Sequence, residues 1–173
     1  TIRSTISRTP KTPFIHSIAP CSFTVTEFTH RTVLLAEAVE LLKPEAGKVI
    51  VDGTLGGGGH TEALLKAGAT VIGIDRDPMA LAAAKARLVG FGERFTALQG
   101  EFGDVESLIS APVDGFLLDL GVSSPQIDTP ERGFSFQNDG PLDMRMSQSG
   151  PTAAELIETT EEGELADLIY KFG

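Results

Sequence analysis

Residues 51–60 read Val-Asp-Gly-Thr-Leu-Gly-Gly-Gly-Gly-His, an apolar strand that ends on a carboxylate and then breaks into four consecutive glycines. Glycine adopts positive φ at little cost and has no side chain to keep a ligand away from the backbone. Such a run between a strand and a helix predicts a loop that cradles a small molecule. A tight turn without a ligand is the alternative interpretation of the glycines alone.

Asp52 indicates which kind of ligand the loop would hold. In the dinucleotide-binding fingerprint the loop wraps a pyrophosphate, which an acid at the strand end would repel. A carboxylate suits a cationic ligand instead. The spacing also departs from that fingerprint, because Gly56 and Gly58 supply the first two glycines but Thr61 stands where the third is expected.

Composition narrows the class of protein. The chain has 173 residues, of which 41% are hydrophobic and 22% charged, as is typical of a single globular domain. It contains no apolar run near the ~20 residues that span a bilayer, so we expect no membrane association. One cysteine, Cys21, excludes an internal disulfide framework, and the scattered histidines His16, His30 and His60 show no paired ligand spacing, so we expect no metal site.

The net charge of −10 is unevenly distributed along the chain. Residues 1–23 hold three basic residues and no acid and are rich in Ser, Thr and Pro, so we expect a disordered basic tail. Its composition overlaps with that of an organellar transit peptide, and sequence upstream of the folded part is the alternative. No basic stripe of the kind that grips a phosphate backbone is visible, so either the substrate is not a polyanion or the basic surface lies outside these residues.

Strands and helices are predicted to alternate from Thr32 onward. Apolar residues recur at helical spacing until Pro44 and Gly47 stop the first helix, and Asp77 and Pro78 have the positions of an N-cap and a first helical residue. Nearly continuous apolar strands between helices are typical of a parallel sheet that is covered on both faces. We expect strands at 48–52, 70–75, 95–99 and 113–120, helices at 61–67, 79–89 and 105–109, and a helical stretch at 152–172 with a Thr152–Glu155 capping box.

Three carboxylates lie at the ends of these predicted strands: Asp52, Asp75 and Asp119. The carboxyl ends of parallel strands line one edge of a sheet, so these acids are expected around a common crevice. Asp75 ends the second strand, where an acid binds both hydroxyls of a ribose, although a simple strand-end cap is the alternative. Phe102 follows the third strand and is a candidate to stack on an adenine ring, with a core position as the alternative.

Five segments together closely resemble one family, the bacterial small-subunit rRNA cytosine-N4 methyltransferases. The segments are 52–60 (DGTLGGGGH), 73–78 (GIDRDP), 119–128 (DLGVSSPQID), 132–136 (RGFSF) and 139–146 (DGPLDMRM). The resemblance implies a Rossmann-like α/β methyltransferase fold that uses S-adenosylmethionine, a sulfonium without phosphate, as the charge of Asp52 also suggests. It implies transfer of a methyl group to the N4 amine of a cytidine in 16S rRNA of the small ribosomal subunit.

The resemblance also implies roles for particular residues. The family's cofactor contacts fall on Gly58, Gly59, His60, Asp75, Phe102, Asp119 and Gln126, to which the charge argument adds Asp52. For His60, a hydrogen bond that orients the loop is the alternative to a direct cofactor contact. The amine must donate its N–H hydrogens to oxygen acceptors and lose a proton after methyl transfer. The catalytic candidates for this are Asp119 and the hydroxyls or backbone carbonyls of Ser123 and Ser124; helix-capping hydroxyls are the alternative for the serines. Substrate contact is expected from Arg132, Phe134, Phe136 and Arg145, since unpaired bases are held by aromatic and arginine planes, with core positions as the alternative for the phenylalanines.

The resemblance also suggests how the chain is divided. Residues 24–125 are expected to form the S-adenosylmethionine-binding α/β domain, and residues 126–173 a loop and the start of an inserted helical domain that recognises substrate. Without a fifth strand the sheet is expected to be truncated, so a non-catalytic cofactor- or RNA-binding fragment is an alternative function. A nicotinamide-dependent oxidoreductase is a further one, against which Asp52 and Thr61 argue. The cytoplasm is the expected compartment, and an organelle is the alternative if the tail is a transit peptide.

Overall fold

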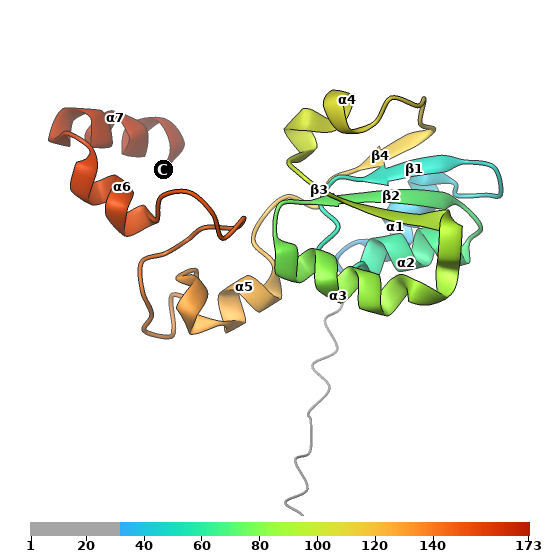
Figure 1. Cartoon of the computed structure of the whole chain (residues 1–173), viewed down its shortest axis with the longest axis horizontal. Helices are drawn as coiled ribbons and strands as arrows, with labels where there is room; N and C mark the ends of the chain where they lie inside the picture. Colours follow the sequence, from blue (N-terminus) through green and yellow to red (C-terminus); the bar gives the residue numbers. More distant parts are fainter. Residues whose placement is uncertain (1–31) are drawn as a thin grey trace, which may run out of the picture.

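The computed structural model describes residues 32–173 (Figure 1). The expected basic tail, residues 1–23, lies outside the described residues, as do Cys21, His16 and His30. No helix among residues 32–173 is both long enough and apolar enough to cross a membrane.

A four-stranded parallel sheet forms the centre of the fold, in the order β3-β2-β1-β4. Its strands are β1 (Val49–Asp52), β2 (Thr70–Asp75), β3 (Phe95–Gln99) and β4 (Gly115–Leu117). In the register of the sheet Asp52 lies opposite both Gly73 of β2 and Leu117 of β4. The expected open α/β sheet of Rossmann-like type is thereby confirmed, because the chain starts in the middle, builds one side and then crosses to the other.

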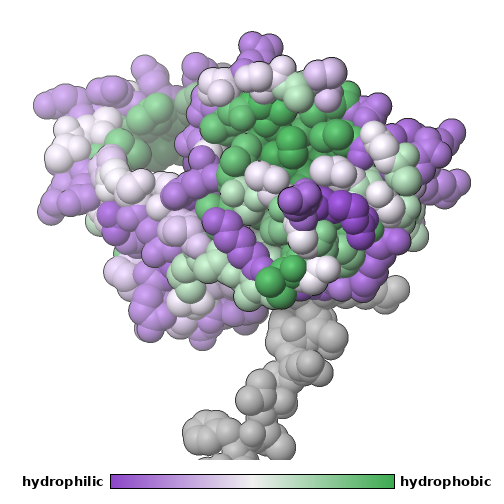
Figure 2. Space-filling model, turned by 45° about the vertical axis from the view of Figure 1, so that its right-hand side comes forward, coloured by the Kyte–Doolittle hydropathy of each residue, from purple (hydrophilic) through white to green (hydrophobic). Residues whose placement is uncertain are grey.

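The two faces of the sheet are covered by helices to different extents. The helices α1, α2 and α3 cover one face, and the short α4 lies over the other (Figure 1). Phe116 and Leu118 are 38% and 43% exposed, so among the described residues the second face is only partly covered. Figure 2 shows the corresponding apolar surface over the sheet part. The helix bounds are α1 Leu35–Leu42, α2 Gly59–Lys66, α3 Pro78–Leu88 and α4 Val105–Leu108, with 3-10 turns at Val89–Arg94 and Phe102–Asp104.

The apolar core lies between the sheet and the three helices of the covered face. Ile50 and Val71 from the strands meet Leu64 and Leu65 of α2 and Leu88 of α3, and all five side chains have no solvent exposure. Burying one such side chain stabilises the fold by about 1.5–3 kcal/mol. The glycine run therefore starts from a rigid base, since α2 follows it directly and is fixed by this core.

Most predicted elements coincide with the observed ones, and the exceptions have physical causes. β2 and β3 have the predicted bounds, whereas α2 begins at Gly59 rather than Thr61 because Gly58, at φ +79°, forms its N-terminal boundary. β4 has three residues instead of the predicted eight, because it pairs only with β1 and only from Gly115 to Leu117.

The last third of the described chain extends away from the sheet (Figure 1). It contains α5 (Ser124–Asp128), a 3-10 turn at Pro130–Arg132, α6 (Ala153–Thr159) and α7 (Glu162–Phe172). The Thr152–Glu155 capping box is confirmed, with Glu155 N–H donating to Thr152 Oγ1 at 3.1 Å and Thr152 N–H to Glu155 Oε2 at 2.8 Å. The predicted single helical stretch is divided into two helices at residues 160–161.

Replacement of Leu88 by alanine tests the contact between the core and the glycine run. We expect Leu88→Ala to lower the free energy of unfolding by about 2–5 kcal/mol, because a fully buried leucine leaves a cavity. Urea unfolding followed by circular dichroism measures this. Leu41→Ala, at a position that is 82% exposed, is the matched control and should change the free energy by less than about 0.5 kcal/mol. Equal effects of the two substitutions would contradict the assignment of the core.

Candidate functional site

A cavity lies at the carboxyl ends of the strands, where open α/β sheets bind ligands. We call it the rim cavity; its volume is about 840 Å³, which is within the range of small-molecule sites. Its walls come from the glycine run, the end of β2, the turn after β3 and the loop after β4. The lining residues include Gly53–Gly57, Gly59, His60, Asp75, Arg76, Phe102 and Asp119–Gln126.

Asp52 does not face the rim cavity. Its side chain is 1% exposed, with Oδ1 accepting from Thr54 N–H at 3.2 Å and Oδ2 from the Thr61 hydroxyl at 2.7 Å. Burial raises the pKa of the Asp52 carboxyl, and the hydrogen bonds from Thr61 and Thr54 partly oppose this. The Asp52 carboxylate therefore lies behind the cavity wall, whereas the sequence argument placed it against the ligand. The carboxylate holds the loop in shape. Its hydrogen bond from the Thr61 hydroxyl explains why a threonine stands where the dinucleotide fingerprint has its third glycine.

Gly58 and Gly59 have different environments. Gly58, at φ +79°, does not line the rim cavity, and a Cβ there would lie 3.0 Å from Leu88 Cδ1. The positive φ therefore favours glycine at this position, and any Cβ would also force the Leu88 side chain of α3 to shift. Gly59 does line the cavity, and a Cβ on it would overlap the Thr32 side chain.

Asp75 and Phe102 both lie where the sequence predicted, on the wall of the rim cavity. Asp75 Oδ2 accepts from Gly56 N–H at 2.8 Å, and Oδ1 accepts from Asp77 N–H at 2.9 Å. Each oxygen has a further lone pair, so the carboxylate can still accept from ligand hydroxyls. Phe102 is 39% exposed, which makes its ring accessible for stacking.

Asp119 and His60 lie near each other on the wall of the rim cavity. Asp119 N–H donates to Thr54 Oγ1 at 2.7 Å, which fixes its backbone against the glycine run. The Asp119 side chain is 51% exposed, and its Oδ2 lies 3.9 Å from His60 Nδ1. His60 Nε2 lies 2.9 Å from the Val33 carbonyl oxygen, so this nitrogen carries the proton, and in the neutral ring the Nδ1 lone pair faces Asp119. Among the described residues no donor bonds the Asp119 carboxylate, which leaves it available to a ligand.

The charges around the rim cavity favour a cation. Its wall carries three carboxylates, Asp75, Glu101 and Asp119, against the guanidinium groups of Arg76 and Arg87. Arg87 Nε also donates to Glu62 at 2.7 Å, so its charge is already matched from outside the cavity. The expectation of a cationic ligand is therefore supported by the excess of carboxylates on the cavity wall, and not by Asp52 alone.

Ser123, Ser124 and Gln126 lie at the beginning of α5, on the cavity wall. Ser123 is the N-cap residue, and its N–H donates to Gln126 Oε1 at 2.9 Å. Gln126 is 6% exposed, and its Nε2 donates to Asp77 Oδ2 at 3.1 Å. The Gln126 amide is thus engaged at both ends by the protein.

Asp77 attaches the chain from α5 onward, residues 124–173, to the sheet part; we call these residues the distal segment. Its carboxylate is 3% exposed and accepts from Met79 N–H at 3.0 Å, as the predicted N-cap. It also accepts from Arg132 at 2.8 Å, Gln126 at 3.1 Å and Gln148 at 3.0 Å. Burial alone would raise the pKa of Asp77, but these hydrogen bonds outweigh it and lower the pKa.

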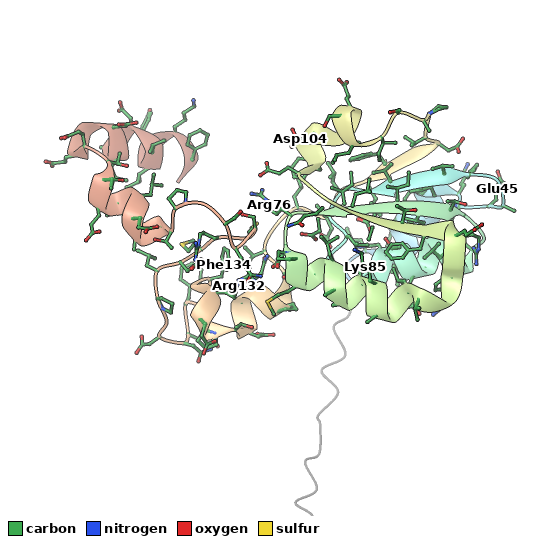
Figure 3. The ribbon with its side chains drawn as sticks, viewed as in Figure 1. Glu45, Arg76, Lys85, Asp104, Arg132 and Phe134 are labelled. Carbon is green, nitrogen blue, oxygen red and sulfur yellow. The ribbon has the colours of Figure 1, made fainter. Side chains whose placement is uncertain are left out.

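Arg132 is a structural residue rather than the exposed substrate contact that the sequence suggested. It is 8% exposed, and its second terminal nitrogen donates to the carbonyls of Arg145 at 3.1 Å and Met146 at 3.0 Å. The reason is the buried carboxylate of Asp77, 55 residues earlier, which needs a cation. Figure 3 shows Arg132 and Phe134 between the sheet and the distal helices.

The other three expected substrate contacts, Arg145, Phe134 and Phe136, differ in their burial and in their partners. Arg145 donates from Nε to Asp143 Oδ1 at 3.0 Å and from Nη2 to Oδ2 at 2.7 Å, and this hydrogen bonding lowers the pKa of the Asp143 carboxyl to about 2. Phe134 is half-buried, and neither phenylalanine is part of a strand or lines the rim cavity. Phe136 is fully exposed, which contradicts the alternative of a core position for this residue.

Three residues of the site were missed from the sequence. Thr54 and Asp77 join separate parts of the cavity wall through side-chain oxygens, and Arg76 lines the wall next to Asp75. Arg76 and Asp77 lie inside the quoted segment 73–78, which was the available signal. No group of three or more potential metal ligands occurs within residues 32–173.

Comparison with known proteins gives one family. A family model described as "MraW methylase family" matches residues 27–173. A "Ribosomal RNA small subunit methyltransferase H" of Myxococcus xanthus is 61% identical over 152 residues, covering 87% of this chain and 50% of that protein. The protein of the same name in Anaeromyxobacter sp. is 53% identical, covering 85% and 49%. A crystal structure of an rRNA methylase from Streptococcus thermophilus has a TM-score of 0.45 at 20% identity, covering 54% of this chain and 57% of that one.

Removal of the Arg132 charge should destabilise the fold. In Arg132→Met the buried Asp77 carboxylate keeps its other donors but loses its cation, and we expect the free energy of unfolding to fall by about 3 kcal/mol. Adding Asp77→Asn, which retains an N-cap, should recover part of this loss. Urea unfolding measures both. A single variant as stable as the parent would show that the pair contributes nothing.

The pair should also appear in the pH dependence of stability. The lowered pKa of Asp77 means that its stabilisation is present above about pH 4 and is lost as the pH falls through the folded-state pKa. Arg132→Met removes the main lowering contact, so the decline between pH 5 and pH 3 should be shallower, by urea unfolding, than in the parent. Asp52 titrates alike in both proteins, so the difference between their curves of unfolding free energy against pH reports Asp77. Parallel curves would contradict the assignment of the Asp77–Arg132 pair.

Proposed function

The chain belongs to the MraW methylase family, and from this membership we propose that it is part of an S-adenosylmethionine-dependent methyltransferase that modifies the N4 amine of a cytidine in 16S rRNA. The chain spans about half the length of the curated relatives that it matches. The printed names of those relatives support ribosomal RNA of the small subunit as the substrate. A ribosome-modifying enzyme acts where ribosomes are assembled, so the proposed compartment is the cytoplasm.

The rim cavity fits this cofactor. Asp75 has free lone pairs for the ribose hydroxyls, and the exposed Phe102 ring is suited to stack on the adenine. Gly59, His60 and Asp119 would hold the methionine part, where the excess of carboxylates suits its ammonium and sulfonium groups. Asp52, Gly58 and Gln126 would act from behind the wall by fixing its shape. The bound cofactor supplies an activated methyl group on sulfur.

The protein's task in this reaction is to make a weak nucleophile available. The lone pair of an exocyclic cytosine amine is delocalised into the ring, so the amine must be held in line with the methyl group. An oxygen acceptor at its N–H hydrogens localises the lone pair and receives a proton once the new C–N bond has formed. We assign this role to Asp119, with the Ser123 and Ser124 hydroxyls as further acceptors. The Nδ1 lone pair of His60, 3.9 Å from Asp119 Oδ2, is the nearest group that would accept this proton from Asp119.

One observation carries this assignment. The Asp119 carboxylate faces the rim cavity without a donor from the described residues, while its backbone is fixed by Thr54. Asp52, Asp75 and Asp77 all have protein donors. An acceptor that is firmly placed but not engaged is what the amine requires.

Asp119→Asn tests the assignment in the whole protein. The amide oxygen keeps the shape but cannot take the proton, so we expect turnover on immature small ribosomal subunits to fall at least about 100-fold. The measurements are transfer of labelled methyl groups and calorimetry with S-adenosylhomocysteine, whose affinity should change less than tenfold. Asp128→Asn, at an exposed position on α5, is the control and should leave turnover unchanged.

The same assays separate the alternatives. Near-normal turnover of Asp119→Asn with intact cofactor affinity would remove the acid from the mechanism. Cofactor binding by the parent protein without methyl transfer would favour a non-catalytic binding role. Binding of NAD in place of S-adenosylhomocysteine would indicate an oxidoreductase instead.

A further inference from the structure

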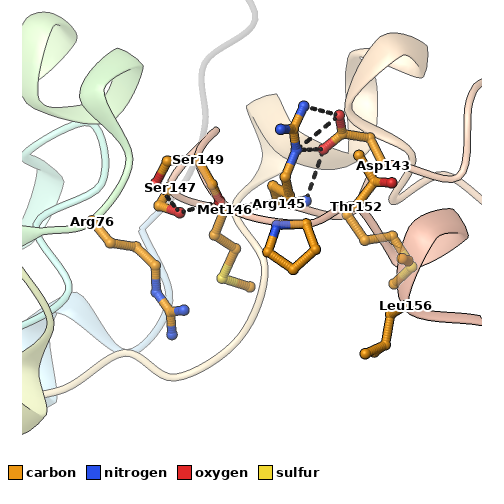
Figure 4. Close-up of a pocket in the computed structure, with 11 residues that line it drawn as sticks. Arg76, Asp143, Arg145, Met146, Ser147, Ser149, Thr152 and Leu156 are labelled. Carbon is orange, nitrogen blue, oxygen red and sulfur yellow. Dashed lines mark hydrogen bonds and ion pairs between the residues drawn. The ribbon is translucent and has the colours of Figure 1, made fainter. Parts of the chain in front are cut away.

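A second cleft adjoins the rim cavity and has no assigned ligand. We call it the side cleft; its volume is about 470 Å³, and it lies between the end of β2 and the segment that leads into α6 (Figure 4). Arg76 and Met146 line both spaces, so the two are neighbours across these side chains. A ligand in the rim cavity that continues past Arg76 would enter the side cleft.

The side cleft is positively charged, in contrast to the rim cavity. Its wall holds two guanidinium groups, Arg76 and Arg145, and one carboxylate, Asp143. Arg145 is paired with Asp143 at 2.7 Å and donates to the Gly150 carbonyl at 3.1 Å, so its charge is matched. Arg76 has only a distant partner, Glu101 at 3.7 Å, and its side chain is 41% exposed. Arg76 is thus the more weakly paired of the two cations of this cleft, and its partner Glu101 does not line the cleft, in a chain whose net charge is −10.

The other wall of the side cleft, from residues 143–153, is mostly without helix but is held in place by hydrogen bonds. Arg132 donates to the carbonyls of Arg145 and Met146, and Gln148 donates to Asp77. The N–H of Ala153 donates to the Asp143 carbonyl at 2.8 Å, which ties the start of α6 to the same segment. The cleft is therefore formed before any ligand binds, which reduces the entropic cost of binding.

The lining is suited to a nucleotide. Met144, Met146 and Leu156 offer apolar surface of the kind that packs against a base, and methionine adapts its shape to the partner. The hydroxyls of Ser147 and Ser149 contact each other at 3.1 Å and can bond a ribose. Arginine at the entrance suits a phosphate, because its guanidinium forms charge-assisted hydrogen bonds.

We propose that the side cleft binds the nucleotide next to the methylated cytidine, with the phosphate between the two nucleotides on Arg76. This inference rests on the proposed function, because it requires an RNA substrate whose target base enters the rim cavity. Single-stranded RNA is bound through splayed bases and a tracked backbone, and the shared wall gives the strand a path from one space to the other. Arg76 touches substrate in this arrangement and contributes to affinity rather than to chemistry.

Arg76→Gln tests the proposal in the whole protein saturated with S-adenosylhomocysteine. The probe is a short single-stranded RNA with one cytidine, followed by fluorescence anisotropy over a range of salt concentrations. We expect affinity to fall about fivefold and the log–log salt slope to shrink by about 0.7, the loss of one phosphate contact. Lys85→Gln removes the same charge from the exposed face of α3, outside both spaces, and should change neither value.

A neutral methylphosphonate at the phosphate beside the cytidine gives the second arm. It should weaken binding to the parent protein and have no further effect on Arg76→Gln, because both changes remove the same contact. Leu156→Glu, which places a carboxylate on the far wall, should also weaken RNA binding, and by more than Leu156→Gln, which removes the apolar contact without adding a charge. Leu156 is 46% exposed, so neither substitution threatens folding.

The outcomes separate this proposal from the proposed function. An unchanged salt slope in Arg76→Gln, or additive losses from the two changes, would overturn the side-cleft proposal while leaving methyl transfer intact. Equal losses of affinity for S-adenosylhomocysteine and RNA would overturn it by assigning Arg76 to the cofactor. A parent protein that neither binds nor methylates RNA would overturn both proposals.

Discussion

The buried carboxylate of Asp77 is the interaction on which the arrangement of the site depends. It lies at the turn between β2 and α3, inside the wall that separates the sheet part from the distal segment. Four donors from four places in the chain converge on its two oxygens. Without it the start of α5, the 3-10 turn and the loop before α6 would have few polar contacts to the sheet. One side chain thus fixes the far walls of both the rim cavity and the side cleft.

Acids have two distinct roles at this edge of the sheet, and the sequence did not separate them. Asp52 and Asp77 are buried and bonded within the protein, so they hold loops in place. Asp119 is exposed to the cavity, and Asp75 combines both roles by bonding Gly56 while lining the wall. The parallel register brings strand ends to one edge, but the local partners decide which carboxylates meet a ligand.

The predictable parts of the fold are those with local causes. β2 and β3 are bounded by glycine and polar residues, and Asp77-Pro78 is a strong start signal for α3, so these elements were predicted to the residue or nearly so. The end of β4 is set instead by its pairing with β1, which stops where Asp52 is opposite Leu117. The burial of Arg132 depends on a partner 55 residues away, which no local pattern reveals. The cavity position of Asp75, Phe102 and Asp119 was predicted, whereas the direction of Asp52 was not.

Arg76 and Met146 form a partition with a ligand-accessible space on each side. Any ligand that orders these two side chains from one side changes the surface offered on the other. The free energy by which an occupant of the rim cavity alters binding in the side cleft must equal the free energy by which the second occupant alters binding of the first. The shared wall therefore makes the two spaces thermodynamically linked, and the order in which they fill leaves the total binding free energy unchanged.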